Sequence, residues 1–574
     1  MLSPTRLALC SIALLASPAF AQTPDFGPNV SVFSPSTPSA TIQAEIDRVY
    51  AIQQHNEFGP QRNAFLFLPG NYQLDIPIGF YTEVAGLGAT PDATHFTGNV
   101  HVDAASRHNN ATTTFWRAAE NFSVTPSDNG TMQWAVSQAV PMRRLHILGN
   151  IVLNQQHGWA SGGWMSDTLV DGNVDSGTQQ QWISRNSDWK SWTGFNWNMV
   201  FVGIPHAPTG DWPVPPFTKV ARTPIVREKP YLTVDSAGHW GMHVPALLHD
   251  TTGVTWDHPA ASPGRTIPFS HIYIAHADHD TAATINAQLA HGKNLLLTPG
   301  IYDLTEPIRV THPNTVVFGL GFATLHPTHG NAALTTADAD GIILAGLLID
   351  AGEQLSPVLV QIGSGKSTAR HQQDPISLSD IFFRVGGAGI GRTGINLEIN
   401  SNDTLVDHTW IWRADHGNGV GWDKNLSNNG LVVNGSDVTV YGLFVEHHQQ
   451  FQVLWNGERG RTYFYQSEIP YDPPTQSAYT SAPNTDGWAS YKVADSVTHH
   501  EAWGLGAYSV FTYPNVFLSH AIEAPATPAV RFHDMITVCL ETNGGIRHII
   551  DDRGDPTVCA PHRIDPKLTL FPTP

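Results

Sequence analysis

Charged side chains are scarce in this sequence. Asp, Glu, Lys and Arg make up 14% of its 574 residues, and 49 acidic against 30 basic side chains give a formal net charge of −19. A protein that binds nucleic acid needs a basic face to neutralise phosphates, so we expect no nucleic-acid partner. The hydrophobic fraction of 41% is too high for a disordered chain. The composition therefore indicates a folded, acidic protein with a sizeable core.

Long hydrophobic runs are also lacking. The apolar stretch at 7–16 is shorter than the roughly 20 residues that a membrane span needs. It follows Arg6 and precedes the small-x-small sequence Ala19-Phe20-Ala21, which is the pattern of a cleaved signal peptide. We expect residues 1–21 to be this signal. The mature protein is then expected to be secreted, extracellular and without a membrane anchor.

Cysteine is rare, with three residues in the whole chain. Cys10 falls within the expected signal, which leaves Cys539 and Cys559. An even pair of cysteines in an oxidising compartment predicts one disulfide. Two cysteines are too few for a structural zinc site.

Motifs for metals and cofactors are missing as well. The 29 histidines include the adjacent pairs His447-His448 and His499-His500. Neighbours in a strand point to opposite faces, so neither pair chelates a metal readily. We find no HExxH motif and no phosphate-binding glycine motif in a suitable context. We therefore expect no metal site and no cofactor.

The chain does contain an internal repeat. Two stretches each read as a short helix, a strand that ends at Pro-Gly, and a further strand. The first comprises 41–46, 65–72 and 86–88, and the second comprises 284–289, 295–302 and 319–321. A helix of this kind can cap the open end of a solenoid. The repeat therefore predicts two solenoids in tandem.

Short β-rich runs follow each opening, and their starts lie roughly 20–35 residues apart. This spacing favours an all-β fold of two tandem right-handed parallel β-helices, pectin-lyase-like and packed side by side. A β-sandwich fits less well, because its turn signals come about every 8–12 residues. We expect the first β-helix at 22–205 and the second at 273–574. The proline-rich segment 206–272 is expected to be a linker packed between them.

Three successive coils of the second predicted β-helix align two glutamates. Placing 403–406 over 437–440, an offset of 34 residues, puts Trp412 over Glu446, and Glu468 follows 22 residues later. Neighbouring parallel strands lie about 4.8 Å apart. We therefore expect these three side chains to form a ladder on one outward face.

Two stacked carboxylates repel each other, so one of them should keep its proton near neutral pH. A carboxylic acid beside a carboxylate is the pair that hydrolyses a glycosidic bond. Aromatic side chains near the pair suit the apolar faces of sugar rings; they are Trp410, Trp412, Trp455 and Tyr471. The alternative is that Glu446 and Glu468 are ordinary surface residues.

Four longer motifs are spread over the mature chain. They are WNGERGRTYFYQSEIPYD at 455–472, QQQWISRN at 179–186, WNMVF at 197–201 and TPIVREKP at 223–230. These motifs resemble those of glycoside hydrolase family 55, whose members have the tandem β-helix. The resemblance implies a secreted exo-β-1,3-glucanase, or laminarinase. Such an enzyme acts on β-1,3-glucan, releases glucose from the non-reducing end and inverts the anomeric centre. We expect it to act as a monomer.

The resemblance also implies roles for individual residues of the second β-helix. Glu468 matches the general acid, and Glu446 matches the carboxylate that helps to hold the attacking water. Tyr471 and Trp412 match residues that line the sugar subsite. Trp412 and Glu446 lie on the two coils that the 34-residue offset aligns. Glu468 lies on the next coil, and Tyr471 follows it by three residues.

The water-positioning residues of the first β-helix are less defined. The family places a glutamine there, and the run 179–181 is its expected source, with Gln179 and Gln181 as the candidates. A serine partner is also expected, and Ser184 and Ser187 are candidates for it.

Two other interpretations stay open at this stage. Asn484-Thr485-Asp486-Gly487 resembles a polygalacturonase motif, but that family also needs a Gly-His-Gly sequence after a paired Asp, and none follows Asp551-Asp552. A non-catalytic carbohydrate-binding solenoid would keep the aromatic residues and release no sugar.

Overall fold

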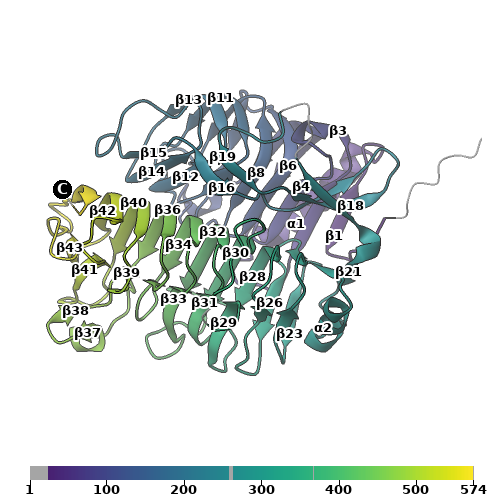
Figure 1. The fold of residues 1–574 in the computed structure, drawn as a ribbon. Coiled ribbons are helices and arrows are strands. Elements are labelled where there is room, and N and C mark those ends of the chain that lie inside the picture. The colour runs from purple at the N-terminus through teal and green to yellow at the C-terminus, as the bar shows by residue number, and fades with distance from the viewer. Residues whose placement is uncertain (1–22, 258–262, 366–367, 573–574) are drawn as a thin grey trace, which may run out of the picture.

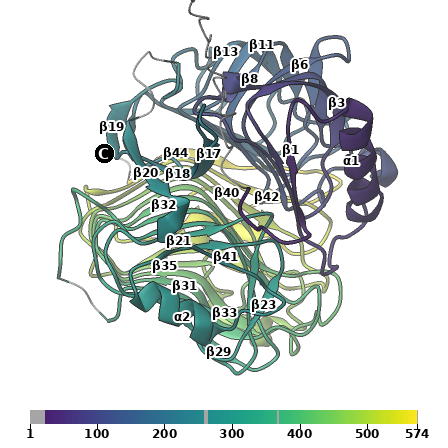
Figure 2. The same cartoon turned by 90° about the vertical axis from the view of Figure 1, so that its right-hand side faces the viewer.

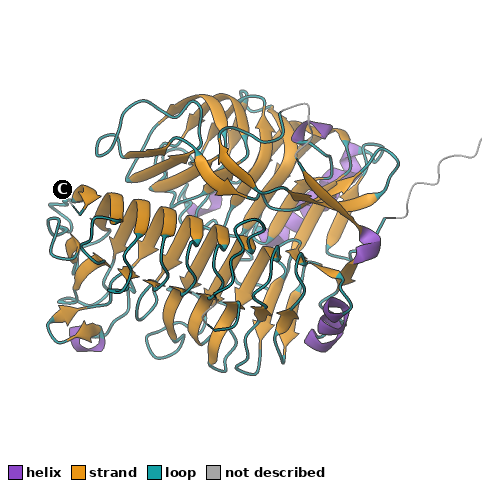
Figure 3. Cartoon of the chain, in the orientation of Figure 1, coloured by secondary structure: helices purple, strands orange, loops and turns teal. Residues whose placement is uncertain are grey.

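The computed structural model describes residues 23–257, 263–365 and 368–572. The expected signal peptide at 1–21 lies outside them. Strands dominate the described chain, as Figure 3 shows, and its α-helices are α1 (Ser39–Gln53) and α2 (Ala282–Ala290). Among these residues no helix is long and apolar enough to cross a membrane.

Parallel strands β1–β15 build the first β-helix, the upper layer in Figure 1. The main path of its 15-stranded sheet runs β1-β2-β4-β6-β8-β10-β12-β14-β15. The strands are β1 (Val30–Phe33), β2 (Asn63–Phe67), β3 (Gly70–Pro77), β4 (Thr82–Gly86), β5 (Thr94–His101), β6 (Arg117–Pro126), β7 (Thr131–Gln133), β8 (Pro141–Ile147), β9 (Asn150–Val152), β10 (Trp164–Ser166), β11 (Leu169–Asp175), β12 (Gln181–Arg185), β13 (Asp188–Thr193), β14 (Asn198–Val202) and β15 (Phe217–Val220).

Strands β21–β44 build the second β-helix, the lower layer in Figure 1. Its two main sheets have 13 and 9 strands, and the final strand β44 pairs antiparallel with β42. The strands are β21 (Ile272–Ala275), β22 (Asn294–Leu297), β23 (Ile301–Leu304), β24 (Ile308–Val310), β25 (Val316–Gly319), β26 (Thr324–Pro327), β27 (Leu334–Thr336), β28 (Ile343–Asp350), β29 (Ser356–Ile362), β30 (Ser377–Val385), β31 (Thr393–Ile399), β32 (Leu405–Arg413), β33 (Ser427–Val433), β34 (Thr439–Glu446), β35 (Val453–Trp455), β36 (Gly460–Glu468), β37 (Thr480–Ala482), β38 (Thr485–Asp486), β39 (Tyr491–Val493), β40 (His500–Ser509), β41 (Leu518–Glu523), β42 (Val530–Cys539), β43 (Ile546–Ile550) and β44 (Lys567–Phe571).

Stacked apolar side chains fill each β-helix. In the second, Ile349, Phe383, Ile411 and Val445 occupy matching positions on four neighbouring strands, and all four are buried. A parallel coil repeats the same inward position one strand spacing further along, so each coil buries the apolar face of the next. The predicted pair of parallel β-helices, side by side, is confirmed (Figure 2).

The two predicted capping helices lie at the start of each β-helix. α1 buries Ile42, Ile46 and Val49 in the core of the first β-helix. α2 buries Ile285 and Leu289 in the core of the second. These apolar faces cover the first coils, whose cores would otherwise meet water.

A buried ionic network joins the two β-helices. Arg143 of the first contacts Asp380 at 2.8 Å and Asp407 at 2.7 Å, both in the second. Arg185 contacts Asp407 at 2.9 Å and Glu228 at 2.6 Å. Removing one partner of a buried ion pair costs about 3–5 kcal/mol. The network therefore favours one relative position of the two β-helices.

The segment between the β-helices forms small antiparallel sheets. They comprise β16 (Thr223–Val226) with β19 (Leu248–Thr251), and β17 (Tyr231–Val234), β18 (Trp240–Pro245) and β20 (Gly264–Pro268). Met242 of this segment shares a buried cluster with Leu66 of the first β-helix and Phe318 of the second. The first sheet continues to β15, past residue 205. The division into 22–205, 206–272 and 273–574 stays a proposal.

Candidate active site

The strand register brings the two glutamates together. Trp412 pairs with Glu446 across β32 and β34. The ladder between β34 and β36 then leads to Glu468, because the His447 backbone N–H donates to the Glu468 carbonyl at 2.8 Å. Glu446 and Glu468 therefore lie at the ends of neighbouring strands, as the coil alignment predicts.

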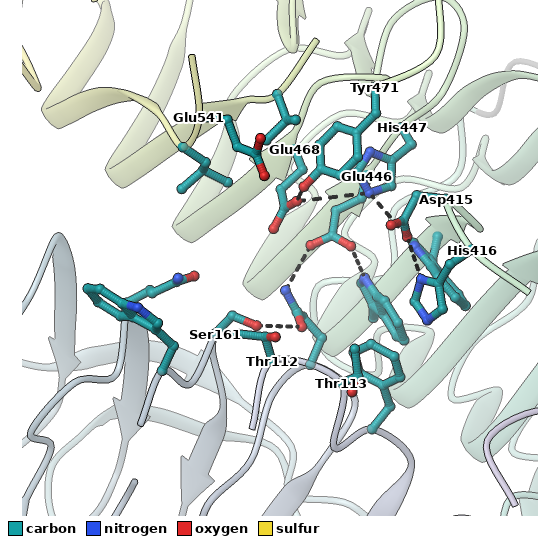
Figure 4. Close-up of a pocket in the computed structure, with 18 of the residues that line it drawn as sticks. Thr112, Thr113, Ser161, Asp415, His416, Glu446, His447, Glu468, Tyr471 and Glu541 are labelled. Carbon is teal, nitrogen blue, oxygen red and sulfur yellow. Dashed lines mark hydrogen bonds and ion pairs between the residues drawn. The ribbon is translucent and has the colours of Figure 1, made fainter. Parts of the chain in front are cut away.

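A cavity of about 470 Å³ lies between the two β-helices at this point. The first β-helix contributes Thr112, Thr113, Phe115, Gln138, Trp159, Ser161, Gln180 and Trp197. The second contributes Trp410, Trp412, Asp415, His416, Glu446, His447, Glu468, Tyr471, Val510, Leu540, Glu541 and Arg563. Figure 4 shows the carboxyl groups of Glu446 and Glu468 pointing into this space.

Glu446 is buried and accepts two hydrogen bonds from nitrogen donors. Gln138 Nε2 donates to Oε1 at 2.8 Å, and Trp410 Nε1 donates to Oε2 at 2.8 Å. Burial, together with the charge of Glu468, raises the pKa of Glu446 well above its usual value, while the Trp410 hydrogen bond acts to lower it. The two donors stabilise the carboxylate form of Glu446.

Gln138 connects Glu446 to a hydroxyl group. Ser161 Oγ donates to Gln138 Oε1 at 3.4 Å. Both residues are buried and come from the first β-helix. The site therefore depends on both β-helices. The polar groups around Glu446 are its own carboxylate, the Gln138 amide and the Ser161 hydroxyl. Such groups can hold a water molecule.

Glu468 lies beside Tyr471 and His447. The Tyr471 hydroxyl donates a hydrogen bond to Glu468 Oε2, and His447 Nε2 lies 4.0 Å from the same oxygen. Burial raises the pKa of Glu468 to about 7; the Tyr471 hydrogen bond acts against this rise and the charge of Asp415 adds to it. Burial raises the pKa of both carboxyl groups, so the pair keeps one proton near neutral pH. A charge on Glu468 would raise the pKa of Glu446 further, but Glu446 has two nitrogen donors and Glu468 has none, so we place the negative charge on Glu446 and the proton on Glu468.

A chain of charged groups extends away from Glu468. His416 contacts Asp415 at 3.1 Å and Glu57 at 2.8 Å, and Arg107 contacts Glu57 at 3.0 Å. Burial acts to raise the pKa of Asp415, but the hydrogen bond and charge of His416 outweigh it and hold this pKa at about 2. Burial acts to lower the pKa of His416, but the two carboxylates raise it to about 10. Asp415 therefore stays negatively charged next to Glu468.

The two ends of the cavity differ in their aromatic residues. At one end, which we call the closed end, Trp410 stacks on Trp412 at 4.8 Å between ring centroids, and Phe115 lies 4.7 Å from Trp410. All three rings are almost fully buried. At the other end, which we call the open end, Trp159 stacks on Trp197 at 6.1 Å and is 49% exposed.

This chain is similar to a known glucanase and to a known domain family. The LAM55 pectate lyase-like domain matches residues 272–468. An exo-beta-1,3-glucanase from Streptomyces sp. (strain SirexAA-E / ActE) is 46% identical over 93% of this chain and 87% of its own length.

Solved structures agree. The structure of sacteLam55A from Streptomyces sp. SirexAA-E has a TM-score of 0.93 and 45% identity, over 96% of this chain and all of that one. A glutamate-to-alanine variant of sacteLam55A in complex with glucose gives a TM-score of 0.92 and 44% identity, with the same coverage. The chain belongs to glycoside hydrolase family 55.

For this family 55 chain, the structure places five of the expected site residues at the cavity. They are Glu446, Glu468, Trp410, Trp412 and Tyr471. Trp455 is different: it is fully buried inside the second β-helix, where it stacks on Tyr491. It does not line the cavity.

The glutamine run does not supply the amide beside Glu446. Gln179 donates to the Val136 and Leu153 carbonyls, and its own oxygen accepts from the Gly162 N–H. Gln181 is buried and does not line the cavity. Gln138, two coils earlier, makes the contact with Glu446 instead.

The serine candidates also point elsewhere. Ser184 accepts a hydrogen bond from Trp182 Nε1, and Ser187 donates to the Arg185 carbonyl. Ser161 is the serine that bonds to Gln138. Aligning the coils of the first β-helix could have found it, because Ser161 follows Gln138 by 23 residues and precedes Gln180, another cavity residue.

The residues of the polygalacturonase-like motif do not line the cavity. Asp486 of the polygalacturonase-like motif sits on a hairpin strand, β38, and pairs with Arg547 at 2.8 Å. His448 faces inward, where Ser427 Oγ lies 2.8 Å from its Nδ1, while its neighbour His447 lines the cavity. Within 23–257, 263–365 and 368–572, no group of three His, Cys, Asp or Glu residues could hold a metal ion.

Proposed function

We propose that this protein is an exo-acting glucan 1,3-β-glucosidase that hydrolyses β-1,3-glucan from the non-reducing end and releases glucose with inversion. The observation that carries the proposal is the pair formed by buried Glu446 and half-buried Glu468 in a cavity with aromatic side chains at one end. The relatives named exo-beta-1,3-glucanase and sacteLam55A support the substrate class. The net charge of −19 suits a neutral glucan better than an anionic polysaccharide.

Glu468 is the proposed general acid. A pKa of about 7 keeps a large share of its carboxyl groups protonated near neutral pH. It gives this proton to the glycosidic oxygen as the bond to the anomeric carbon breaks, so the leaving sugar departs as an alcohol. General acid catalysis typically contributes about 10²–10⁴-fold to the rate.

Glu446 and Gln138 are the proposed holders of the attacking water, with Ser161 as a further contact. The carboxylate of Glu446 accepts a proton from the water as the water attacks the anomeric carbon on the face opposite the leaving group. One displacement on the opposite face inverts the configuration, and inverting enzymes leave about 6.5–9.5 Å between the two carboxyl groups for this water.

The closed end of the cavity supports exo action. Trp410, Trp412 and Phe115 line this end with aromatic side chains, and Asp415 and His416 line it with charged ones. A glucan chain must then enter with its end first. Trp412 and Tyr471 are the proposed contacts of the terminal glucose.

We also propose that the protein is secreted and acts as a monomer. The sequence at 1–21 and the disulfide between Cys539 and Cys559 support export. The protein isolated from the medium of its host should begin at Gln22, which N-terminal sequencing checks.

The time course of products from a linear β-1,3-glucan tests the function. Glucose should be the sole early product when the digest is separated by size. Early oligosaccharides of several lengths would contradict exo action. Binding of the glucan without any release of reducing sugar would favour the non-catalytic solenoid.

A further inference from the structure

The open end of the cavity has a wall that the catalytic roles above do not use. Leu540 and Glu541 follow directly after β42, and Arg563 lies on a turn further along the chain. All three line the cavity. Figure 4 shows the Glu541 side chain pointing into it. We call these three residues the C-terminal wall.

The disulfide joins the two segments that carry this wall. Cys539, the last residue of β42, is bonded to Cys559. Glu541 comes two residues after the first cysteine, and its carbonyl accepts a hydrogen bond of 3.2 Å from the Ala560 N–H beside the second. The cross-link therefore acts directly on the positions of the wall residues.

The turn with Arg563 reaches across to the first β-helix. Val558 and Ile564 exchange backbone hydrogen bonds of 3.1 and 2.9 Å, which closes the turn. The Arg563 guanidinium lies 4.6 Å over the ring of Trp197, which itself stacks on Trp159. The wall is thus continuous with the aromatic pair at the open end.

The wall offers both kinds of hydrogen-bonding group. The Glu541 carboxylate has no hydrogen bond or ion pair with the part of the chain that the structure describes, so its oxygens are free to accept. Arg563 uses Nε to bond Asp565 at 2.9 Å and has its terminal N–H groups to donate. An acceptor, a donor and an indole face together match the hydroxyl groups and the apolar face of a pyranose ring.

We propose that the C-terminal wall binds the glucose units on the leaving-group side of the cleaved bond, and that the Cys539–Cys559 disulfide holds it in place. The inference rests on the proposed function, because it needs the terminal glucose to occupy the closed end. Glu541 and Arg563 then determine specificity and do not touch the reacting atoms.

The test compares substrates with different leaving groups. An aryl β-glucoside places no sugar at the wall, whereas β-1,3-linked oligosaccharides of three to six glucose units do. For Glu541→Gln and Arg563→Gln, kcat/KM on the oligosaccharides should fall about tenfold further than on the aryl glucoside, mainly through KM, because one polar contact is lost. Arg547→Ala removes an exposed arginine outside the cavity and should match the wild type on both substrates.

The disulfide is tested with the double variant Cys539→Ala, Cys559→Ala and with the reduced wild-type protein. Loss of folded protein lowers both activities equally, so the ratio of the two kcat/KM values is the readout. This ratio should shift in the same direction as in Glu541→Gln. If the wild type hydrolyses the oligosaccharides and every variant keeps its ratio, the proposed function stands and the inference is wrong. If the wild type releases no sugar from any substrate, the proposed function is wrong and the inference falls with it.

Discussion

The closed and open ends of the cavity differ in how deeply their lining side chains are buried. At the closed end Trp410 and Trp412 are each 1% exposed, and a buried amide and indole hold Glu446. At the open end Trp159 is 49% exposed and Glu541 faces solvent. Burial strengthens electrostatic interactions and shifts pKa values, so the closed end is suited to proton transfer. The open end is suited to recognising the chain that enters.

The two ends also differ in how their charged side chains are paired. At the closed end, Asp415, His416, Glu57 and Arg107 alternate in sign, which keeps Asp415 ionised. This fixed negative charge raises the pKa of Glu468. Changes at the closed end should therefore reduce kcat, and changes at the open end should mainly raise KM.

The largest effect is expected for Glu468→Gln. The amide keeps the shape of the side chain and removes the acid proton, so the rate on β-1,3-glucan should fall by about 10²–10⁴-fold. Glucose binding, measured by calorimetry, should persist. Turnover close to that of the wild type would exclude Glu468 as the acid.

Glu446→Gln should be nearly as severe, with a loss of about 10²-fold or more, because the water loses its base. It also removes a negative charge beside Glu468, so the Glu468 carboxylate becomes easier to form and its pKa falls. Activity depends on protonated Glu468 and is lost as pH rises through that pKa. The alkaline limb of the pH profile of the residual activity should therefore move to lower pH. A limb that stays in place would contradict the coupling between the two carboxyl groups.

Gln138→Leu should have an intermediate effect. It removes one donor from buried Glu446 and one contact of the proposed water, a loss of about 1–3 kcal/mol that corresponds to roughly tenfold to 100-fold in kcat. Gln179→Leu is the matched control, because that amide bonds only to backbone groups. The control should lower the melting temperature and leave kcat of the folded protein near that of the wild type. A large loss of kcat in Gln179→Leu but not in Gln138→Leu would instead assign the water-holding role to the run 179–181.

The smallest effect is expected for Trp159→Ala at the open end. A lost ring contact of about 0.5–1.5 kcal/mol should raise KM for long glucans two- to tenfold. The value of kcat should change little. Leu355→Ala, at another exposed apolar residue outside the cavity, serves as the control. A fall in kcat without a change in KM would contradict the claim that the open end acts mainly in substrate binding.

Sequence reasoning predicted the elements that repeat along the chain. The offset of 34 residues gave the pairing of Trp412 with Glu446, because inward and outward positions recur in each coil of a parallel β-helix. The capping helices and the disulfide followed from local patterns in the same way. The domain boundaries stay a prediction.

Contacts between the two β-helices could not be predicted in this way. Gln138 and Glu446 are 308 residues apart and meet only because the two solenoids pack side by side. No coil alignment within one solenoid gives the register between two. Trp455 was expected at the sugar site because it lies near the two glutamates in the sequence. Its strand β35 belongs to another sheet of the coil, however, and the ring lies in the core.

The configuration of the first product tests the central claim most directly. Proton NMR of a linear β-1,3-glucan digest, recorded before mutarotation, distinguishes the two anomers of glucose. Protonation by Glu468 and attack by a water held at Glu446 and Gln138 on the opposite face predict α-glucose as the initial product. Initial β-glucose would mean retention through a covalent intermediate and would contradict the assignment of the two carboxyl groups.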